Sequence, residues 1–236
     1  EHYRFPQKLY LTWSTRYAVR FADRIIAVSQ FTADELQNRL GADPKKISVI
    51  HEGVDRHAYQ RFFSESEKQD VLRTLGITKP YFLFLGVLQP RKNLERLIEA
   101  FSRIRLTGPG LVSLNLVIAG KFGWMYGKIL QAPKKYGVED RVKFPGFVPQ
   151  DFLPILLQES LALIQPSLTE GFGLPVLEAM AAGSPVIAAN AGALPEVVGN
   201  AGLYVDPLSV DDMSKTLQAV VSSEKMRSEL RKKGLS

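Results

Sequence analysis

Two glutamates, Glu170 and Glu178, flank a glycine-rich segment that leads into a predicted helix. Pro175 suits the first turn of that helix, because a residue without an N–H group costs nothing there. The unpaired N–H groups at a helix start, together with the helix dipole, form a binding site for an anion. The residues whose backbone would form this anion site are Phe172, Gly173 and Leu174.

The two glutamates extend this anion site at both ends. A helical side chain leans toward the N-terminus, so the carboxylate of Glu178 is predicted to tilt back toward the same ligand. A carboxylate accepts two hydrogen bonds from a vicinal diol such as that of ribose. A ligand with phosphate between two hydroxyl-bearing ends, such as a nucleotide sugar, therefore suits this segment. A structural alternative stays open, in which Glu178 only favours the helix dipole and Glu170 is a solvated loop residue.

A second charged segment precedes another predicted helix. It begins at Gly86, a candidate substrate-binding residue, and contains the adjacent cations Arg91 and Lys92. The helix dipole disfavours cations at this end, so an anion is expected between this loop and its neighbour. A diphosphate would satisfy that expectation, and both cations would stabilise the charge that develops when a glycosidic bond breaks. The alternative is that Arg91 and Lys92 form a basic turn exposed to solvent. Lys121, in the next loop, is predicted either to contact the phosphate or the base of a ligand or to face solvent.

Composition excludes several other classes of function. The chain has 236 residues, no cysteine and a formal net charge of +6, so thiol catalysis and cysteine metal sites are absent. The three histidines lack zinc-ligand spacing and no Asp-x-Asp pair occurs, so we expect no metal site. The basic residues are spread thinly and do not lie among aromatic residues, which argues against nucleic-acid binding.

The elements that must position these residues alternate between short apolar runs and helical patterns, which predicts an α/β fold with a parallel sheet covered by helices on both faces. The expected strands are residues 24–28, 47–50, 81–85, 114–119, 142–144, 161–164, 185–188 and 203–205. The first expected helix begins with a capping box at Thr32 and Glu35 and ends at about Gly41. Another begins at about residue 149, and the remaining expected helices span residues 64–76, 93–105, 125–136, 174–182, 210–222 and 224–233. Ligands bind beyond the carboxyl ends of such strands, where the loops 86–92, 120–124, 146–148 and 165–173 are expected.

The motifs in these loops, taken in order, resemble the retaining glycosyltransferases of family 4, the group 1 glycosyl transferases, whose GT-B fold has two facing Rossmann-like domains. The resemblance covers nearly the whole chain from about Trp13. The motifs that carry it are Glu170-x7-Glu178, Pro90-Arg91-Lys92-Asn93, Gly146-Phe147-Val148, Pro195-Glu196-Val197-Val198 and Ala22-Asp23-Arg24-Ile25-Ile26-Ala27-Val28-Ser29.

The resemblance implies a role for each motif. Glu170 would lie at the transferred sugar, Glu178 would bind the ribose hydroxyls, and Arg91 with Lys92 would bind the diphosphate and assist its departure. The backbone around Val148 would meet the base, while Phe172, Gly173 and Leu174 would contact sugar and phosphate. The family is typically metal-independent, uses no cofactor besides its nucleotide-sugar co-substrate, and retains the anomeric configuration. Its leaving phosphate is thought to assist deprotonation of the acceptor.

The resemblance also implies a division of the chain. Residues 1–46 would be a remnant of the N-terminal acceptor-side domain and linker, and residues 47–236 the donor-binding domain. We expect the saccharide or lipid-linked acceptor to bind the part of that first domain outside this chain, and this chain by itself to transfer sugar poorly. Two positions depart from the family pattern: Glu52 stands where Asn is frequent, and Val87 where Arg is frequent.

The sequence thus predicts the donor-binding half of a retaining hexosyltransferase that uses a UDP-glucose-like sugar or GDP-mannose in polysaccharide, glycolipid or lipopolysaccharide synthesis. The alternatives are a sugar-nucleotide epimerase of the same architecture and a non-catalytic module that binds nucleotide sugars. We expect a cytoplasmic protein, with peripheral contact to the membrane as a further possibility because of its positive charge.

Overall fold

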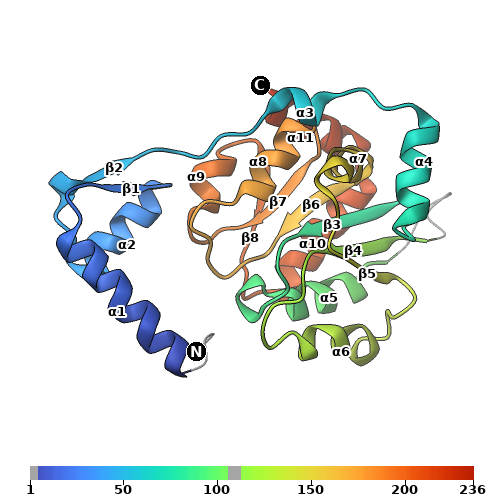
Figure 1. Ribbon diagram of the computed structural model, residues 1–236. Helices are drawn as coiled ribbons and strands as arrows, with labels where there is room; N and C mark the ends of the chain where they lie inside the picture. Colours follow the sequence, from blue (N-terminus) through green and yellow to red (C-terminus); the bar gives the residue numbers. More distant parts are fainter. Residues whose placement is uncertain (1–4, 106–112) are drawn as a thin grey trace.

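The computed structural model describes residues 5–105 and 113–236. Its larger unit is built around a six-stranded parallel sheet with the strand order β5-β4-β3-β6-β7-β8 (Figure 1). The strands are β3 (Tyr81–Leu85), β4 (Asn115–Ala119), β5 (Val142–Gly146), β6 (Ala162–Gln165), β7 (Val186–Ala189) and β8 (Gly202–Val205). The predicted α/β class with a parallel sheet is confirmed.

Helices cover both faces of this sheet. One face packs against α3 (Arg56–Gln60), α4 (Glu65–Thr74), α7 (Leu153–Glu159), α8 (Leu174–Ala181) and α9 (Leu194–Val198). The other face packs against α5 (Leu94–Ser102), α6 (Gly127–Lys135) and α10 (Val210–Ser222). The last helix, α11 (Glu224–Leu235), packs against α8.

Strand β3 shows why its sequence is apolar throughout. Tyr81, Leu83 and Leu85 face the α4 and α7 side, whereas Phe82 and Phe84 face the α5 and α10 side. Successive side chains of a strand point to opposite faces, so a strand covered on both sides needs apolar residues at every position. All five side chains of β3 are buried.

The strand order places β3 and β6 side by side, although their following helices lie on opposite faces of the sheet. Helix α5 follows β3 and α8 follows β6. Such a reversal leaves a crevice at the carboxyl ends of the two strands, which is where ligands bind in open α/β sheets. The loops predicted to hold the chemistry, after Gly86 and before Gly173, meet at this crevice.

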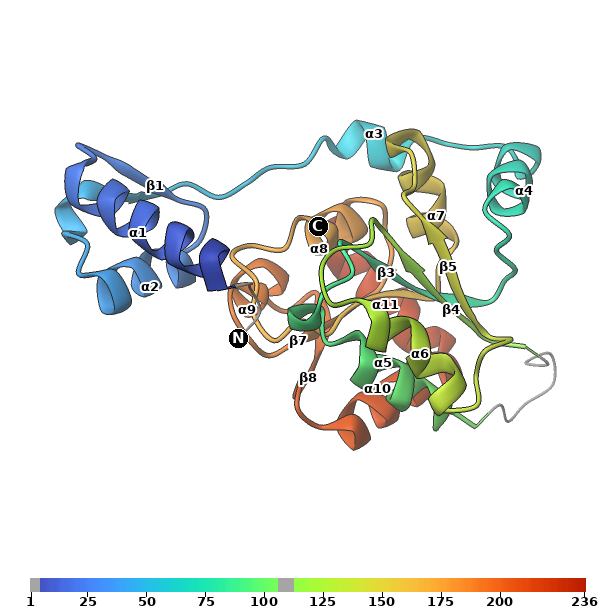
Figure 2. The same cartoon turned by 60° about the horizontal axis from the view of Figure 1, so that its bottom comes forward.

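A smaller N-terminal unit stands beside the sheet. It consists of α1 (Phe5–Phe21), β1 (Ile25–Ala27), α2 (Gln30–Leu40) and β2 (Ile47–Val49), with β1 and β2 paired in parallel. Residues 50–55, which have no regular secondary structure, run as an extended segment from β2 to α3 (Figures 1 and 2). The pairing places β2 with the N-terminal unit, beyond the boundary after residue 46 that the sequence predicts.

Several predicted elements differ from the structure. Helix α2 is capped by Ser29, whose side chain accepts from Thr32 N, so the predicted capping box at Thr32 is wrong. An extended residue caps a helix best, and Ser29 has this backbone conformation. Helix α5 ends at Ser102 and not at Arg105, and β5 extends to Gly146. The short helices α3 and α9 were not predicted from the sequence.

Candidate functional site

One pocket opens at the carboxyl edge of the sheet, beside the crevice between β3 and β6. It has a volume of about 240 Å³. Four predicted site residues line it together: Gly86 after β3, Lys121 after β4, Val148 after β5, and Glu178 from α8. The remaining lining residues are Leu85, Val87, Ala119, Gly120, Phe147, Gln150 and Leu153.

Two glycines allow the loops after β3 and β4 to meet at this pocket. A Cβ atom built on Gly120 would lie 1.9 Å from the carbonyl oxygen of Gly86, a distance no side chain tolerates. Gly86 and Gly120 also have φ angles of 147° and 144°, which L side chains rarely adopt. Glycine is therefore required where these two strands end.

The carboxylate of Glu178 is hydrogen-bonded to α3, the helix that follows the extended segment 50–55. The Tyr59 hydroxyl of α3 donates to Glu178 Oε1 at 2.6 Å, and Gln150 Nε2 donates to the same hydroxyl oxygen at 3.0 Å. Burial raises the pKa of Glu178, although the hydrogen bond from Tyr59 opposes this rise. Tyr59 and Gln150 were not predicted as site residues from the sequence, because no local pattern relates either residue to Glu178.

The outer wall of the pocket carries a cation and an aromatic ring. Lys121 Nζ lies 5.0 Å from the centroid of the exposed Phe147 ring. A cation above a ring at this distance is attracted by the electrons of the ring face. Lys121 is therefore held at the pocket by Phe147, next to the buried Val148.

Glu170 lies in a buried cluster of hydrogen-bond donors. Lys92 Nζ bonds Glu170 Oε1, and Arg91 Nη1 donates to Glu170 Oε2 at 2.7 Å. Two neighbours in its own loop also donate to Oε1, Ser167 Oγ at 2.7 Å and Gln165 Nε2 at 2.9 Å. The carboxylate is thus held by four side chains, three of them buried.

The charges in this cluster decide its ionisation. Burial by itself would raise the pKa of the Glu170 carboxyl, but the adjacent Lys92, with Ser167 and Arg91, lowers it to about 2. Burial lowers the pKa of Lys92, and the carboxylate of Glu170 opposes that change. Glu170 is consequently ionised at neutral pH and paired with cations.

The cluster also joins the turn after β3 to the loop after β6. Arg91 Nη1 donates to the carbonyl of Thr169 at 3.1 Å, and Leu168 N donates to the carbonyl of Arg91 at 2.9 Å. With its amide oxygen turned toward Arg91, Gln89 accepts from Arg91 Nε at 2.8 Å. The anion that the sequence analysis expected beside Arg91 and Lys92 is, in this structure, the carboxylate of Glu170.

The buried ion-pair cluster and the pocket are adjacent. Lys92 Nζ lies 3.6 Å from the position of a Cβ built on Gly86, which lines the pocket. On the other side of Glu170, helix α8 begins after Gly173, whose φ of 112° favours glycine. Phe172 is buried, whereas 41% of Leu174 is exposed. Pro175 has no N–H, and the N–H groups of Val176 and Leu177 donate to the Gly173 carbonyl at 2.9 and 3.4 Å. Of the first turn of α8, the Leu174 N–H and the positive end of the helix dipole are therefore left to interact with a ligand.

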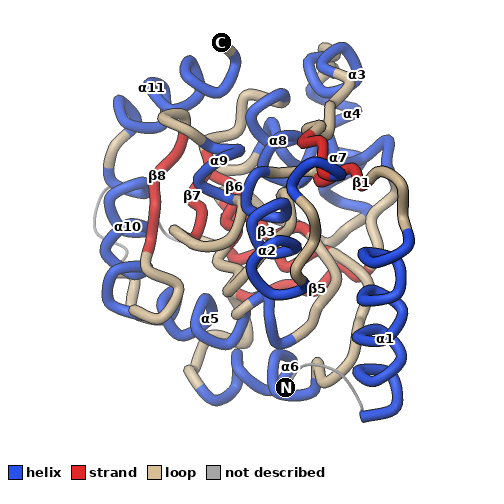
Figure 3. Tube along the Cα trace, turned by 90° about the vertical axis from the view of Figure 1, so that its left-hand side faces the viewer, coloured by secondary structure: helices blue, strands red, loops and turns tan. Residues whose placement is uncertain are grey.

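The N-terminal unit docks against the same loop. The carbonyl of Gly171 accepts from Ser29 Oγ at 2.6 Å and from Thr32 Oγ1 at 3.0 Å. Figure 3, viewed from the side of this unit, shows α2 in front of the sheet. The loop between Glu170 and α8 therefore forms part of the contact between the two units.

A second contact between the two units is centred on Glu196 of α9. Its carboxylate accepts from the backbone N–H groups of Gln30 at 2.7 Å and Phe31 at 3.1 Å, and bonds His51 Nε2 at 2.7 Å. These two N–H groups belong to the first turn of α2, where a carboxylate interacts favourably with the helix dipole. Glu196 thus caps a helix of the other unit.

The described part of the chain contains neither a cluster of metal ligands nor a membrane-spanning helix. Within residues 5–105 and 113–236, no group of three or more His, Asp or Glu side chains is placed to hold a metal ion. None of the helices in this part of the chain combines the length and apolar character needed to cross a bilayer.

Comparison with protein families decides the relationship. The model described as glycosyl transferases group 1 matches residues 67–236, and the model described as Glycosyltransferase Family 4 matches residues 1–58. This chain belongs to the group 1 glycosyl transferases. The resemblance predicted from the motifs at 90–93 and 170–178 is confirmed.

Two curated relatives illustrate how much of a family member this chain represents. It is 30% identical over 228 residues to O-antigen chain mannosyltransferase B of Escherichia coli, a match that covers 96% of this chain and 59% of the relative. It is 34% identical over 173 residues to D-inositol 3-phosphate glycosyltransferase of Streptomyces scabiei, covering 70% and 38%. The chain thus spans less than two thirds of the length of these two relatives.

Among solved structures, Alr3699/HepE of Anabaena in complex with UDP and glucose matches with a TM-score of 0.82 and 25% identity, covering 95% of this chain and 60% of HepE. The C-terminal domain of the group 1 family protein LpcC of Francisella tularensis matches with a TM-score of 0.65 and 26% identity, covering 78% and 95%. The fold around the pocket is that of a glycosyltransferase.

Proposed function

We propose that this chain binds a nucleotide-diphosphate sugar along the carboxyl edge of its sheet and belongs to a retaining hexosyltransferase. The observation that carries the proposal is that the pocket with Glu178, the cations Arg91 and Lys92, and the start of α8 follow one another at the β3–β6 crevice. In this order they suit the base and ribose, the diphosphate, and the sugar of one extended ligand.

The base end of the ligand is assigned to the wall formed by Lys121, Phe147 and Val148. The Phe147 ring and the mainly apolar lining offer a stacking surface for a flat base, and Lys121 offers a hydrogen-bond donor. Glu178 lies in the same pocket, and its carboxylate suits the ribose hydroxyls.

The charged cluster suits the sugar and diphosphate end. With a pKa of about 2, Glu170 is an anion at neutral pH and therefore accepts a hydrogen bond from a sugar hydroxyl instead of acting as a general acid. Lys92 lies between Glu170 and Gly86, so a diphosphate at Gly86 would share this cation with the carboxylate. Charge that develops on the leaving diphosphate would be stabilised by Lys92, by Arg91 and by the positive end of the α8 dipole.

We propose that the reaction needs no metal ion and no cofactor beyond the sugar nucleotide. The two cations at positions 91 and 92 and the start of α8 would supply the positive charge that a diphosphate leaving group requires. Retention of the anomeric configuration follows from the family resemblance, together with a role for the leaving phosphate in deprotonating the acceptor.

The donor and pathway are proposed from relatives. HepE in complex with UDP and glucose favours a UDP-glucose-like donor, and the E. coli mannosyltransferase favours GDP-mannose as the second candidate. Its O-antigen role supports a place in polysaccharide or lipopolysaccharide synthesis. The relatives named above are transferases, which favours transfer over an epimerase or a non-catalytic module.

Titration calorimetry of this chain with UDP, GDP and their sugars tests the proposal. We expect one nucleotide to bind, and its affinity to fall about tenfold or more in Arg91→Ala, because a charge-assisted contact is lost. Glu178→Ala is the matched variant for the other end: it should weaken the nucleotide but leave inorganic diphosphate binding nearly unchanged. If no UDP or GDP compound binds the unmodified chain, the proposal is wrong.

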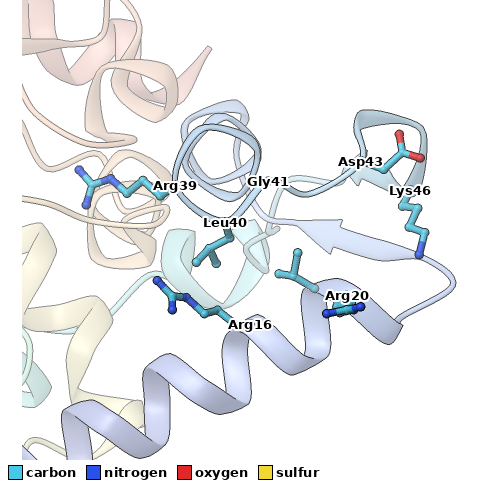
Figure 4. A pocket seen from close by; sticks show the side chains of 8 residues that line it. Arg16, Arg20, Arg39, Leu40, Gly41, Asp43 and Lys46 are labelled. Atoms are coloured by element: carbon cyan, nitrogen blue, oxygen red, sulfur yellow. The ribbon is translucent and has the colours of Figure 1, made fainter.

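The acceptor and the expected membrane contact concern the N-terminal unit. We propose that a saccharide or lipid-linked acceptor binds on this side, and that the protein is cytoplasmic with peripheral membrane contact. The candidate site for the membrane contact is a cavity of about 590 Å³ between α1 and the end of α2 (Figure 4). Its cationic lining residues are Arg16, Arg20, Arg39 and Lys46. Cations attract anionic lipid headgroups, so binding to vesicles that contain anionic lipid, compared with neutral ones, is the measurement.

A further inference from the structure

Tyr59 lies at a position that the proposed function does not use. It belongs to α3, the first helix after the segment 50–55, and its side chain is buried against the α8 face of the sheet. Its backbone carbonyl accepts from Gln158 Nε2 of α7 at 2.8 Å. Both the ring and the main chain of Tyr59 are therefore fixed by neighbouring elements.

The hydroxyl of Tyr59 is oriented by two partners. Gln150 Nε2 donates to the hydroxyl oxygen at 3.0 Å, and the hydroxyl lies 2.6 Å from Glu178 Oε1. An amide nitrogen only donates, so the hydroxyl accepts from Gln150 and directs its own proton to Glu178. Burial, with Glu178 beside it, raises the pKa of Tyr59, so the phenol stays protonated and remains a donor.

The Glu178 carboxylate has fewer hydrogen-bond partners than the Glu170 carboxylate, so its orientation depends more on a single donor, Tyr59. Among the described residues, no Lys or Arg side chain pairs with Glu178, and Tyr59 is the one side chain that bonds it. A buried carboxylate held by one hydrogen bond turns readily when that bond is removed. Tyr59 thus anchors Glu178 Oε1, in a residue that lines the pocket.

We propose that Tyr59 is a positioning residue of the donor site, which orients the Glu178 carboxylate for the hydroxyl groups of the nucleoside. The inference rests on the proposed function. It assigns a role in nucleotide affinity to a residue outside the motifs of the family, on the segment that joins the two units.

The variant Tyr59→Phe tests this role because it removes one oxygen atom and keeps the buried ring. By calorimetry with UDP, or with GDP if that nucleotide binds more tightly, we expect affinity to fall about tenfold, the scale of one hydrogen bond to a charged group. Affinity for inorganic diphosphate should stay unchanged. Tyr81→Phe is the matched control, since Tyr81 is a buried tyrosine whose hydroxyl donates to the Leu156 carbonyl, away from the pocket.

Two further readouts separate positioning from a general structural effect. Loss of the Tyr59 hydrogen bond should raise the pKa of Glu178, so nucleotide affinity in Tyr59→Phe should decline at a higher pH on acidification than in the unmodified chain. In the double variant with Glu178→Ala, which removes the carboxylate that Tyr59 would orient, the two losses should be strongly non-additive.

Nucleotide binding at unchanged affinity in Tyr59→Phe, or equal losses for nucleotide and diphosphate, would overturn this inference while leaving the proposed function intact. Additive losses in the double variant would overturn it as well. Failure of the unmodified chain to bind UDP or GDP would overturn both proposals.

Discussion

Glu170 and Glu178 belong to one motif, yet they lie in opposite environments. Glu170 is held by Lys92, Arg91 and two polar neighbours, and its pKa is lowered to about 2. Glu178 lies in a pocket without a cationic partner among the described residues, and burial raises its pKa. The motif places two carboxyl groups at one helix start, but other elements determine the properties of each.

This difference assigns different tasks to the two residues. The carboxylate of Glu170 anchors the turn after β3 to the loop after β6, so it supports the fold and the proposed site together. Glu178 supports the fold little, because a buried carboxylate with one hydroxyl partner loses solvation without a matching ion pair.

Replacement of Lys92 should have the largest effect. Lys92→Met leaves the buried Glu170 carboxylate without its closest cation, and breaking a buried pair in this way costs about 3 to 5 kcal/mol of unfolding free energy. Lys121→Met is the control, since Lys121 is exposed and should cost less than about 0.5 kcal/mol. Urea denaturation measures both; similar losses in the two variants would contradict the role given to the Glu170 cluster.

The pH dependence of stability should separate Glu170 from its amide variant. A carboxyl with a lowered pKa stabilises the fold above its unfolded value, and this stability is lost as pH falls through its folded value. The advantage of the unmodified chain over Glu170→Gln should therefore be complete above pH 4.5 and disappear between pH 4.5 and about 2. An advantage that is constant over this range, measured by urea denaturation at each pH, would show that the ion pairs are not its source.

The same amide substitution at Glu178 should give a small effect of opposite sign. Because its pKa is raised, the ionised Glu178 carboxyl lowers stability as pH rises above its unfolded value. Glu178→Gln keeps an acceptor for Tyr59 and never ionises, so at pH 7 it should be at least as stable as the unmodified chain. The difference should vanish on acidification to pH values where both chains are neutral at this position. A clear loss of stability at pH 7 would end the contrast between the two glutamates.

Much of the fold was predictable from the sequence because the signals are local. The run Tyr81–Leu85 is apolar at every position, and the run in β4 is apolar from Leu116 to Ala119, so both runs indicated buried strands. Ser64 and Glu67 form the capping box that begins α4. Short helices such as α3 and α9 lack a full amphipathic repeat, so no local pattern revealed them.

The candidate site was predictable only in part. Positions Arg91, Lys92, Glu170 and Glu178 follow from loop positions and helix starts, which chain order specifies. Tyr59 bonds Glu178 from a position 119 residues away in sequence, and Arg91 bonds Glu170 across 79 residues. A single sequence carries no record of such contacts.

By itself, the sequence determined the element types, the glycines at strand ends and the residue types available at the edge of the sheet, because backbone propensity and periodic burial act over short stretches of chain. Tertiary structure alone decided that the anion between Arg91 and Lys92 is Glu170, and that a tyrosine from the linker segment holds Glu178. The reason is physical: the ionisation and orientation of a buried group depend on the charges and donors within a few ångströms, and these arrive from distant parts of the chain.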